Sequence, residues 1–133
     1  MAITVTDNRQ DGPGFPIAKY QFTQQSWAAA ASTATTEDIK INGTIVAVEV
    51  IASDSANAIT YTVALATSNG TSVFSVASIA ENAKTWLDAR SHKGTQDANF
   101  NPVPVNDTLT ATFTPSGVPG TGGSTLDVIL YVE

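Results

Sequence analysis

The sequence predicts an all-β fold, an antiparallel β-sandwich with a jelly-roll-like arrangement. Apolar and polar residues alternate with period two along most of the chain after Gly43, which is the pattern of half-buried strands. Asn69-Gly70 lies between two such runs and is a strong hairpin signal. Long Pro/Gly-rich loops separate other runs, as in sandwiches. An immunoglobulin-like sandwich is the alternative, although its Cys…Trp…Cys hallmark is absent because the chain has no cysteine.

The alternation also predicts which residues form strands and how one pair of strands is aligned. The expected strands span residues 19–22, 44–51, 59–66, 73–76, 108–114 and 126–133. A two-residue type I′ turn at 69–70 needs positive φ at both positions, which Asn and Gly tolerate. It would pair Leu65 with Phe74, Val63 with Val76 and Tyr61 with Ser78. The large apolar side chains then share one face, and a slip of one residue would destroy that agreement.

Two stretches are less regular than the rest. Ile79, Ala83, Trp86, Leu87 and Arg90 have helical spacing, so we expect at most one short helix, within residues 79–90. Residues 1–36 contain one short strand and a turn-rich stretch. We therefore expect a single domain with an N-terminal arm or edge hairpin at 1–36 and the sandwich at 37–133.

Composition disfavours several classes of partner. The net charge is −6, with 6 Lys and Arg against 12 Asp and Glu, which disfavours direct contact with nucleic acid and with anionic membranes. No apolar run is long enough to span a bilayer. The opening Met-Ala-Ile-Thr-Val-Thr has no basic stretch followed by an apolar one, so we expect no signal peptide and synthesis in a cytoplasm.

Candidate chemical groups are few, and the predicted function is not enzymatic. The single histidine, His92, lies in a polar loop beside Ser91, but triads are assembled from separate elements. Glu49 is the one acid within a convincing apolar run, and a strand acid or interface partner is the favoured interpretation. Asp7 and Asp11 lack the spacing of a calcium loop. We expect no catalytic residue, no cofactor and no metal site.

The aromatic residues are the candidates for contacts with other subunits, because aromatic side chains are enriched at protein interfaces. Trp27 and Trp86 do not belong to a row of alternating exposed aromatics, so core or interface packing is favoured over sugar stacking. The interface candidates are Phe15, Tyr20, Phe22, Trp27, Trp86 and Tyr131.

The C-terminal part of the chain carries a resemblance to a class of viral proteins. It reads Asn-Asp-Thr-Leu-Thr-Ala-Thr-Phe-Thr-Pro-Ser-Gly over residues 106–117 and Thr-Leu-Asp-Val-Ile-Leu-Tyr-Val-Glu over residues 125–133. With the Met-Ala-Ile-Thr-Val-Thr-Asp opening and the Thr/Ala-rich strands, it resembles small virion proteins of tailed bacteriophages, which are often capsid decoration (cement) or head-fibre proteins.

The resemblance implies a function and partners. Such cement proteins are commonly sandwich or jelly-roll modules, often homotrimers, that clamp neighbouring subunits of the major coat protein on the capsid exterior. We therefore expect a virion structural protein made in a bacterial host cytoplasm. The alternative is a fibre or tail module that recognises a receptor or a glycan.

Overall fold

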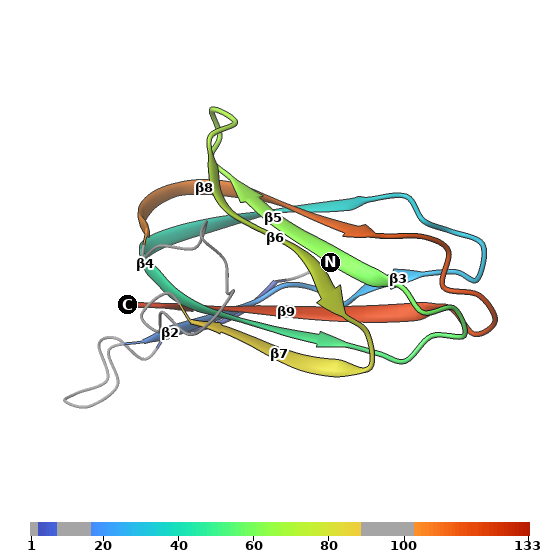
Figure 1. Cartoon of the computed structure of the whole chain (residues 1–133). Helices are drawn as coiled ribbons and strands as arrows, with labels where there is room; N and C mark the ends of the chain where they lie inside the picture. Colours follow the sequence, from blue (N-terminus) through green and yellow to red (C-terminus); the bar gives the residue numbers. More distant parts are fainter. Residues whose placement is uncertain (1–2, 8–16, 89–102) are drawn as a thin grey trace.

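The computed structural model describes residues 3–7, 17–88 and 103–133, and this part of the chain is built from nine strands joined in one antiparallel sheet. The strands are β1 (Thr4–Asp7), β2 (Ala18–Gln21), β3 (Gln25–Trp27), β4 (Thr35–Ala52), β5 (Thr60–Ala66), β6 (Ser72–Ala80), β7 (Ala83–Asp88), β8 (Val103–Pro115) and β9 (Ser124–Val132). The sheet folds over into two facing layers (Figure 1), so the predicted all-β, sandwich-like architecture is confirmed.

Strand β4 belongs to both layers. Its first part, residues 35–45, pairs with β8, and its last part, residues 47–52, pairs with β9 on one edge and β7 on the other. The first layer therefore contains β4, β8, β5 and β6, and the second contains β1, β2, β3, β9, β4 and β7. The strand turns the corner where Gly43 has a φ of 143° and the register shifts between Ile45 and Ala47, which is how strands switch layers. Figure 1 shows this bend.

Aromatic side chains fill the space between the layers. The rings of Phe22, beside β2, and Phe113, on β8, meet edge to face with centroids 5.3 Å apart. Trp27 of β3 meets Tyr61 of β5 at 5.5 Å, and its indole N–H donates to the carbonyl of Thr33 at 2.8 Å. These contacts join strands that share no backbone ladder, so they hold the two layers together.

The hairpin between β5 and β6 confirms part of the predicted register. Leu65 pairs with Phe74 and Val63 with Val76, as expected, but Tyr61 pairs with Ile79. The predicted Tyr61–Ser78 pair is wrong because β6 carries an extra residue there, at a bulge where Ser78 has a φ of 59°.

The turn of this hairpin also differs from the prediction. Gly70 has a φ of 84°, whereas Asn69 is not among the residues with positive φ. The N–H of Gly70 donates to the carbonyl of Thr67 at 2.9 Å, so a longer turn replaces the expected type I′ turn. Asp107 of β8 stabilises it by accepting a hydrogen bond from the Ser68 hydroxyl at 2.9 Å. A carboxylate distant in sequence thus contributes to the turn, which no local pattern could reveal.

The short helix predicted within residues 79–90 is wrong for the residues that the structure describes. Residues 83–88 form β7, which pairs with β4. Leu87 is buried and Trp86 is exposed, which is the alternation of a strand rather than the stripe of a helix. Asn82, with a φ of 49°, makes the turn into β7 and donates its N–H to the carbonyl of Ser53 at 3.1 Å. Pairing with β4 therefore overrides the local helical spacing.

The N-terminal region contributes strands to the second layer. The short strand predicted at 19–22 is present as β2, which pairs with β9, and β3 pairs with β9 further along. Gln25 is buried and donates to Glu37 Oε2 at 2.7 Å, while it accepts from the Thr35 hydroxyl at 2.6 Å. In the described part of the chain, no helix is long and apolar enough to cross a membrane.

Stability should fall at alkaline pH because of Tyr61. Burial raises the pKa of its phenol, the Ser124 hydroxyl partly lowers it, and the negative charge of Glu81 raises it further. A folded pKa above the unfolded value of 10.0 means that the stabilisation is complete below that pH and is lost as the pH rises through the folded pKa. Chemical denaturation at a series of pH values from about 9 to about 11.5 should show a decline that is shallower in Tyr61→Phe. Parallel curves for the two proteins would contradict this assignment.

Candidate functional site

The outward-facing side of the second layer carries the most distinctive surface of the described chain. Directly paired residues share a face of a sheet, and Glu49 pairs with Trp86 on one side and with Ile129 on the other. The neighbouring positions with the same orientation complete what we call the outer aromatic face: Ala47, Glu49 and Ile51 of β4, Lys84 and Trp86 of β7, and Asp127, Ile129 and Tyr131 of β9.

Trp86 extends across β4 toward β9. The ring centroids of Trp86 and Tyr131 are 4.9 Å apart, although their strands flank β4 and are therefore separated by about twice the 4.7–4.9 Å strand spacing. Ala47, which lies between them and pairs with Tyr131, is only 4% exposed although it is on the outward side of the sheet. The small side chain of Ala47 leaves room for the two rings, and Trp86 itself stays 47% exposed.

Polar groups surround the two rings. The Tyr131 hydroxyl donates to Glu49 Oε1 at 3.3 Å. The pKa of Tyr131 is raised above its ordinary value by burial and then by the charge and hydrogen bond of Glu49. Lys84, on the same side of β7 as Trp86, is exposed. These groups offer hydrogen-bond acceptors and donors beside an aromatic surface.

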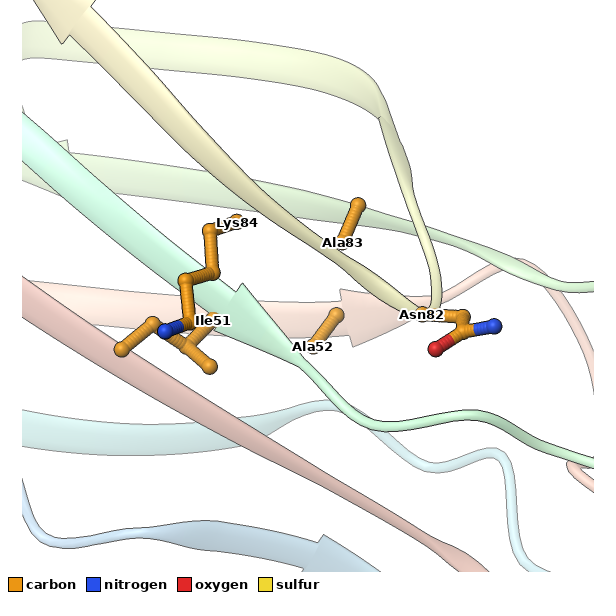
Figure 2. A pocket seen from close by; sticks show the side chains of 5 residues that line it. All are labelled: Ile51, Ala52, Asn82, Ala83 and Lys84. Atoms are coloured by element: carbon orange, nitrogen blue, oxygen red, sulfur yellow. The ribbon is translucent and has the colours of Figure 1, made fainter.

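A shallow hollow of about 260 Å³ lies at the end of this face, where β4 and β7 finish their pairing. It is lined by Ile51, Ala52, Asn82, Ala83 and Lys84. Figure 2 shows the side chains of Ile51 and Lys84 side by side, with Asn82 at the turn that leads into β7. Ile51 and Lys84 belong to the outer aromatic face, whereas Ala52 and Ala83 pair with each other on the opposite side of the sheet, so the hollow lies at the edge of this face.

The structure places the predicted interface residues in two different environments. Tyr20, Phe22 and Trp27 are buried in the chain's own core, with exposures of 6%, 2% and 4%, so they offer no area to another subunit. Trp86 and Tyr131 lie on the outer aromatic face, and their role at an interface stays a prediction. Phe15 lies outside the described residues.

The structure describes some of the candidate chemical groups and not others. Glu49 lies beside Tyr131, where its carboxylate accepts a hydrogen bond. His92 and Asp11 lie outside the described residues. Within residues 3–7, 17–88 and 103–133, no three His, Cys, Asp or Glu side chains gather where they could hold a metal ion.

Strand β1 is a second surface feature. It pairs with β2 at the end of the strand order. All four of its residues are exposed, and Val5 is 50% exposed. Ile3, just before it, is packed partly against the core. Both faces of this strand are exposed to solvent, so a neighbouring molecule can reach the apolar side chain of Val5.

Comparisons with known proteins find similarity at the level of solved structures. No family model matches the sequence, and no curated protein matches it. Among solved structures, chains from infectious bursal disease virus are similar: one from the Gx strain has a TM-score of 0.40 and 13% identity over 88% of this chain, and one from the Gt strain has a TM-score of 0.39 and 12% identity over 87%. The chain spans about a third of their length, 32% and 35% respectively.

Proposed function

We propose that this chain is a virion structural protein, a capsid decoration subunit that acts as a homotrimer and stabilises the assembled coat lattice. The observation that carries the proposal is β1, whose four residues are exposed on both faces at the end of the strand order of the described sheet. The resemblance of the C-terminal stretch to small phage virion proteins supports the same function. The chain's negative charge suits an exterior position, away from packaged nucleic acid.

The physical basis is selective binding to the assembled lattice. A subunit that binds the lattice but not the separated coat proteins lowers the free energy of the assembled state by mass action. The sandwich supplies a scaffold, and β1 supplies a short arm with a strand edge and an apolar side chain, Val5, for a neighbouring subunit. Three weak arms acting together bind much more tightly than one arm.

Undecorated capsids mixed with the protein should melt at a higher temperature, and the gain should depend on Val5. Val5→Ser should reduce the gain, because it removes an apolar contact at the arm, while leaving the unfolding of the free protein within about 0.5 kcal/mol of the original. Differential scanning calorimetry of the capsids measures the first quantity, and chemical denaturation of the free protein measures the second.

Val118→Ser is the matched control. Val118 is a valine of similar exposure, 41%, on the loop between β8 and β9, so its substitution should leave the capsid melting temperature unchanged. An absence of any gain with the original protein would refute the decoration function. Equal losses from both substitutions would refute the role of β1. Light scattering should give three times the chain mass of 13.8 kDa, and a stable monomer would exclude the trimer.

A further inference from the structure

We propose that the outer aromatic face binds a neutral saccharide, with Trp86 as the stacking surface and with Glu49 and Lys84 as the hydrogen-bonding groups. This inference goes beyond the lattice function and does not rest on it. It rests on two features that occur together, a large exposed indole and polar side chains of both hydrogen-bonding types beside it, and on a hollow at the edge of the same face.

The indole of Trp86 is held in place before any ligand arrives. Its strand, β7, is paired with β4 over six residue pairs, and its ring contacts that of Tyr131 at a centroid distance of 4.9 Å. Tyr131 is in turn held by its hydrogen bond to Glu49. A ring that is positioned by a sheet and by a second ring loses little conformational freedom on binding, which favours recognition by a small surface.

An aromatic face suits the C–H face of a pyranose ring, because the π-system is apolar and electron-rich on its face. The hydroxyl groups around a sugar ring both donate and accept hydrogen bonds. Glu49 pairs directly with Trp86 and can accept from them. Lys84 lies two residues before Trp86 on the same side of β7 and can donate to them. A sugar on the indole therefore has partners of both kinds within reach.

We place a second sugar unit of the ligand at the hollow beside Lys84. Residues two apart on one strand are separated by about 7 Å, so the surface from Trp86 to Lys84 follows β7 toward the hollow. A linear oligosaccharide could lie along this line, with one unit on the indole and the next at the hollow lined by Ile51 and Lys84 (Figure 2).

Charge decides in favour of a neutral ligand. The chain has a net charge of −6, and Glu49 lies at the centre of the face. An acidic saccharide would meet repulsion from both. A second copy of the chain is the other occupant that an exposed aromatic surface could take, and the experiment below separates it from a saccharide.

The two tryptophans provide a test within one molecule. In ¹H–¹⁵N spectra each indole N–H gives its own signal, and that of Trp27 is buried and bonded to the Thr33 carbonyl at 2.8 Å. Titration with maltohexaose, cellohexaose and chitohexaose, all neutral, should shift the Trp86 signal with at least one of them while the Trp27 signal stays in place. No shift with any of the three at millimolar concentration would overturn the proposal, as would equal shifts of both signals.

Variants then assign the effect to the face. Trp86→Ala should weaken the affinity by at least about tenfold, because the stacking surface is lost, and Trp86→Tyr should retain most of it. Val118→Ala, at an exposed valine elsewhere, should leave the affinity unchanged. An unaltered affinity in Trp86→Ala, with its fold verified by its melting temperature, would overturn the proposal. Conversion of an oligomer to a monomer by this substitution would also overturn it, since the face would then be a contact between copies.

The two proposals fail independently. Val5→Ser is expected to reduce capsid stabilisation with saccharide binding intact, and Trp86→Ala is expected to do the reverse. Loss of both activities in Trp86→Ala would assign the face to the lattice rather than to a saccharide and so would count against this inference.

Discussion

Replacing Gly123 with alanine should lower the free energy of unfolding by about 3 kcal/mol, a large part of the stability of a small domain. Gly123 has a φ of 68°, where alanine is strained, and an added Cβ would lie 2.4 Å from the carbonyl oxygen of Trp27. That carbonyl cannot move easily, because Trp27 pairs with Ser124 in the β3–β9 ladder and its ring fills the core. The substitution should therefore strain the junction between the two layers.

Gly122→Ala separates the backbone strain of a positive φ from the clash of an added Cβ with the Trp27 carbonyl oxygen. Gly122 also has positive φ, 89°, but an added Cβ there would meet nothing within 4 Å. Its cost should be limited to about 1–2 kcal/mol of backbone strain. Thermal unfolding should show Gly123→Ala melting well below Gly122→Ala, by several degrees. Equal melting temperatures would mean that φ alone, and not the approach to Trp27, requires glycine at position 123.

Replacing Phe113 with alanine should cost about 3–5 kcal/mol. Phe113 is fully buried on β8 and contacts Phe22 edge to face across the layers. It pairs with Val63 on one side and with Thr35 on the other, so paired strands flank it and the surroundings cannot collapse readily into the cavity. Chemical denaturation should show a lower midpoint with little change in slope.

Phe113→Leu is the conservative comparison. It keeps most of the buried apolar volume and loses the edge-to-face ring contact, so it should cost clearly less than the alanine variant. If the two variants were equally destabilised, the ring geometry rather than the filled volume would dominate. If Phe113→Ala cost under about 1 kcal/mol, the assignment of Phe113 to the centre of the core would be wrong.

Strands with a clear alternation were predictable because large apolar residues occupy the buried face of each strand, and small or polar residues occupy the other face. In β5, Tyr61, Val63 and Leu65 are fully buried, and the alternating threonines and alanines are not. The same contrast predicted the pairing of Leu65 with Phe74 and of Val63 with Val76 between β5 and β6. The register shift near Ser78 was not predictable, because a bulge depends on how the strand is bent by its partners and leaves no local signature here.

The predictions from the sequence differ most from the structure where pairing with distant strands decides the secondary structure. Residues 83–88 have apolar spacing that also fits a helix, and only the available edge of β4 makes them a strand. The length of β4 was underestimated for a related reason. Gly43, which usually interrupts a strand, lies inside this one, because β8 continues to pair with it through the bend.

The candidate site was only partly visible in the sequence. The presence of Glu49 among apolar residues and the alternation of Ile129 and Tyr131 indicated an outward face that is incompletely polar. The approach of Trp86 to Tyr131 was hidden, because it requires β7 and β9 to flank the same strand. Tyr20, Phe22 and Trp27 were indistinguishable from surface aromatics because a short strand does not show which side faces the core.

The continuity of β4 through both layers has a consequence for how the molecule opens. A sandwich whose layers are joined only by loops can lose one sheet while the other persists, whereas here breaking either layer breaks hydrogen bonds of the same strand. Slow amide exchange in the β4–β8 ladder and in the β4–β9 ladder should therefore report one cooperative unit with a shared opening free energy. Force or heat acting on either layer is transmitted to the other along a single backbone.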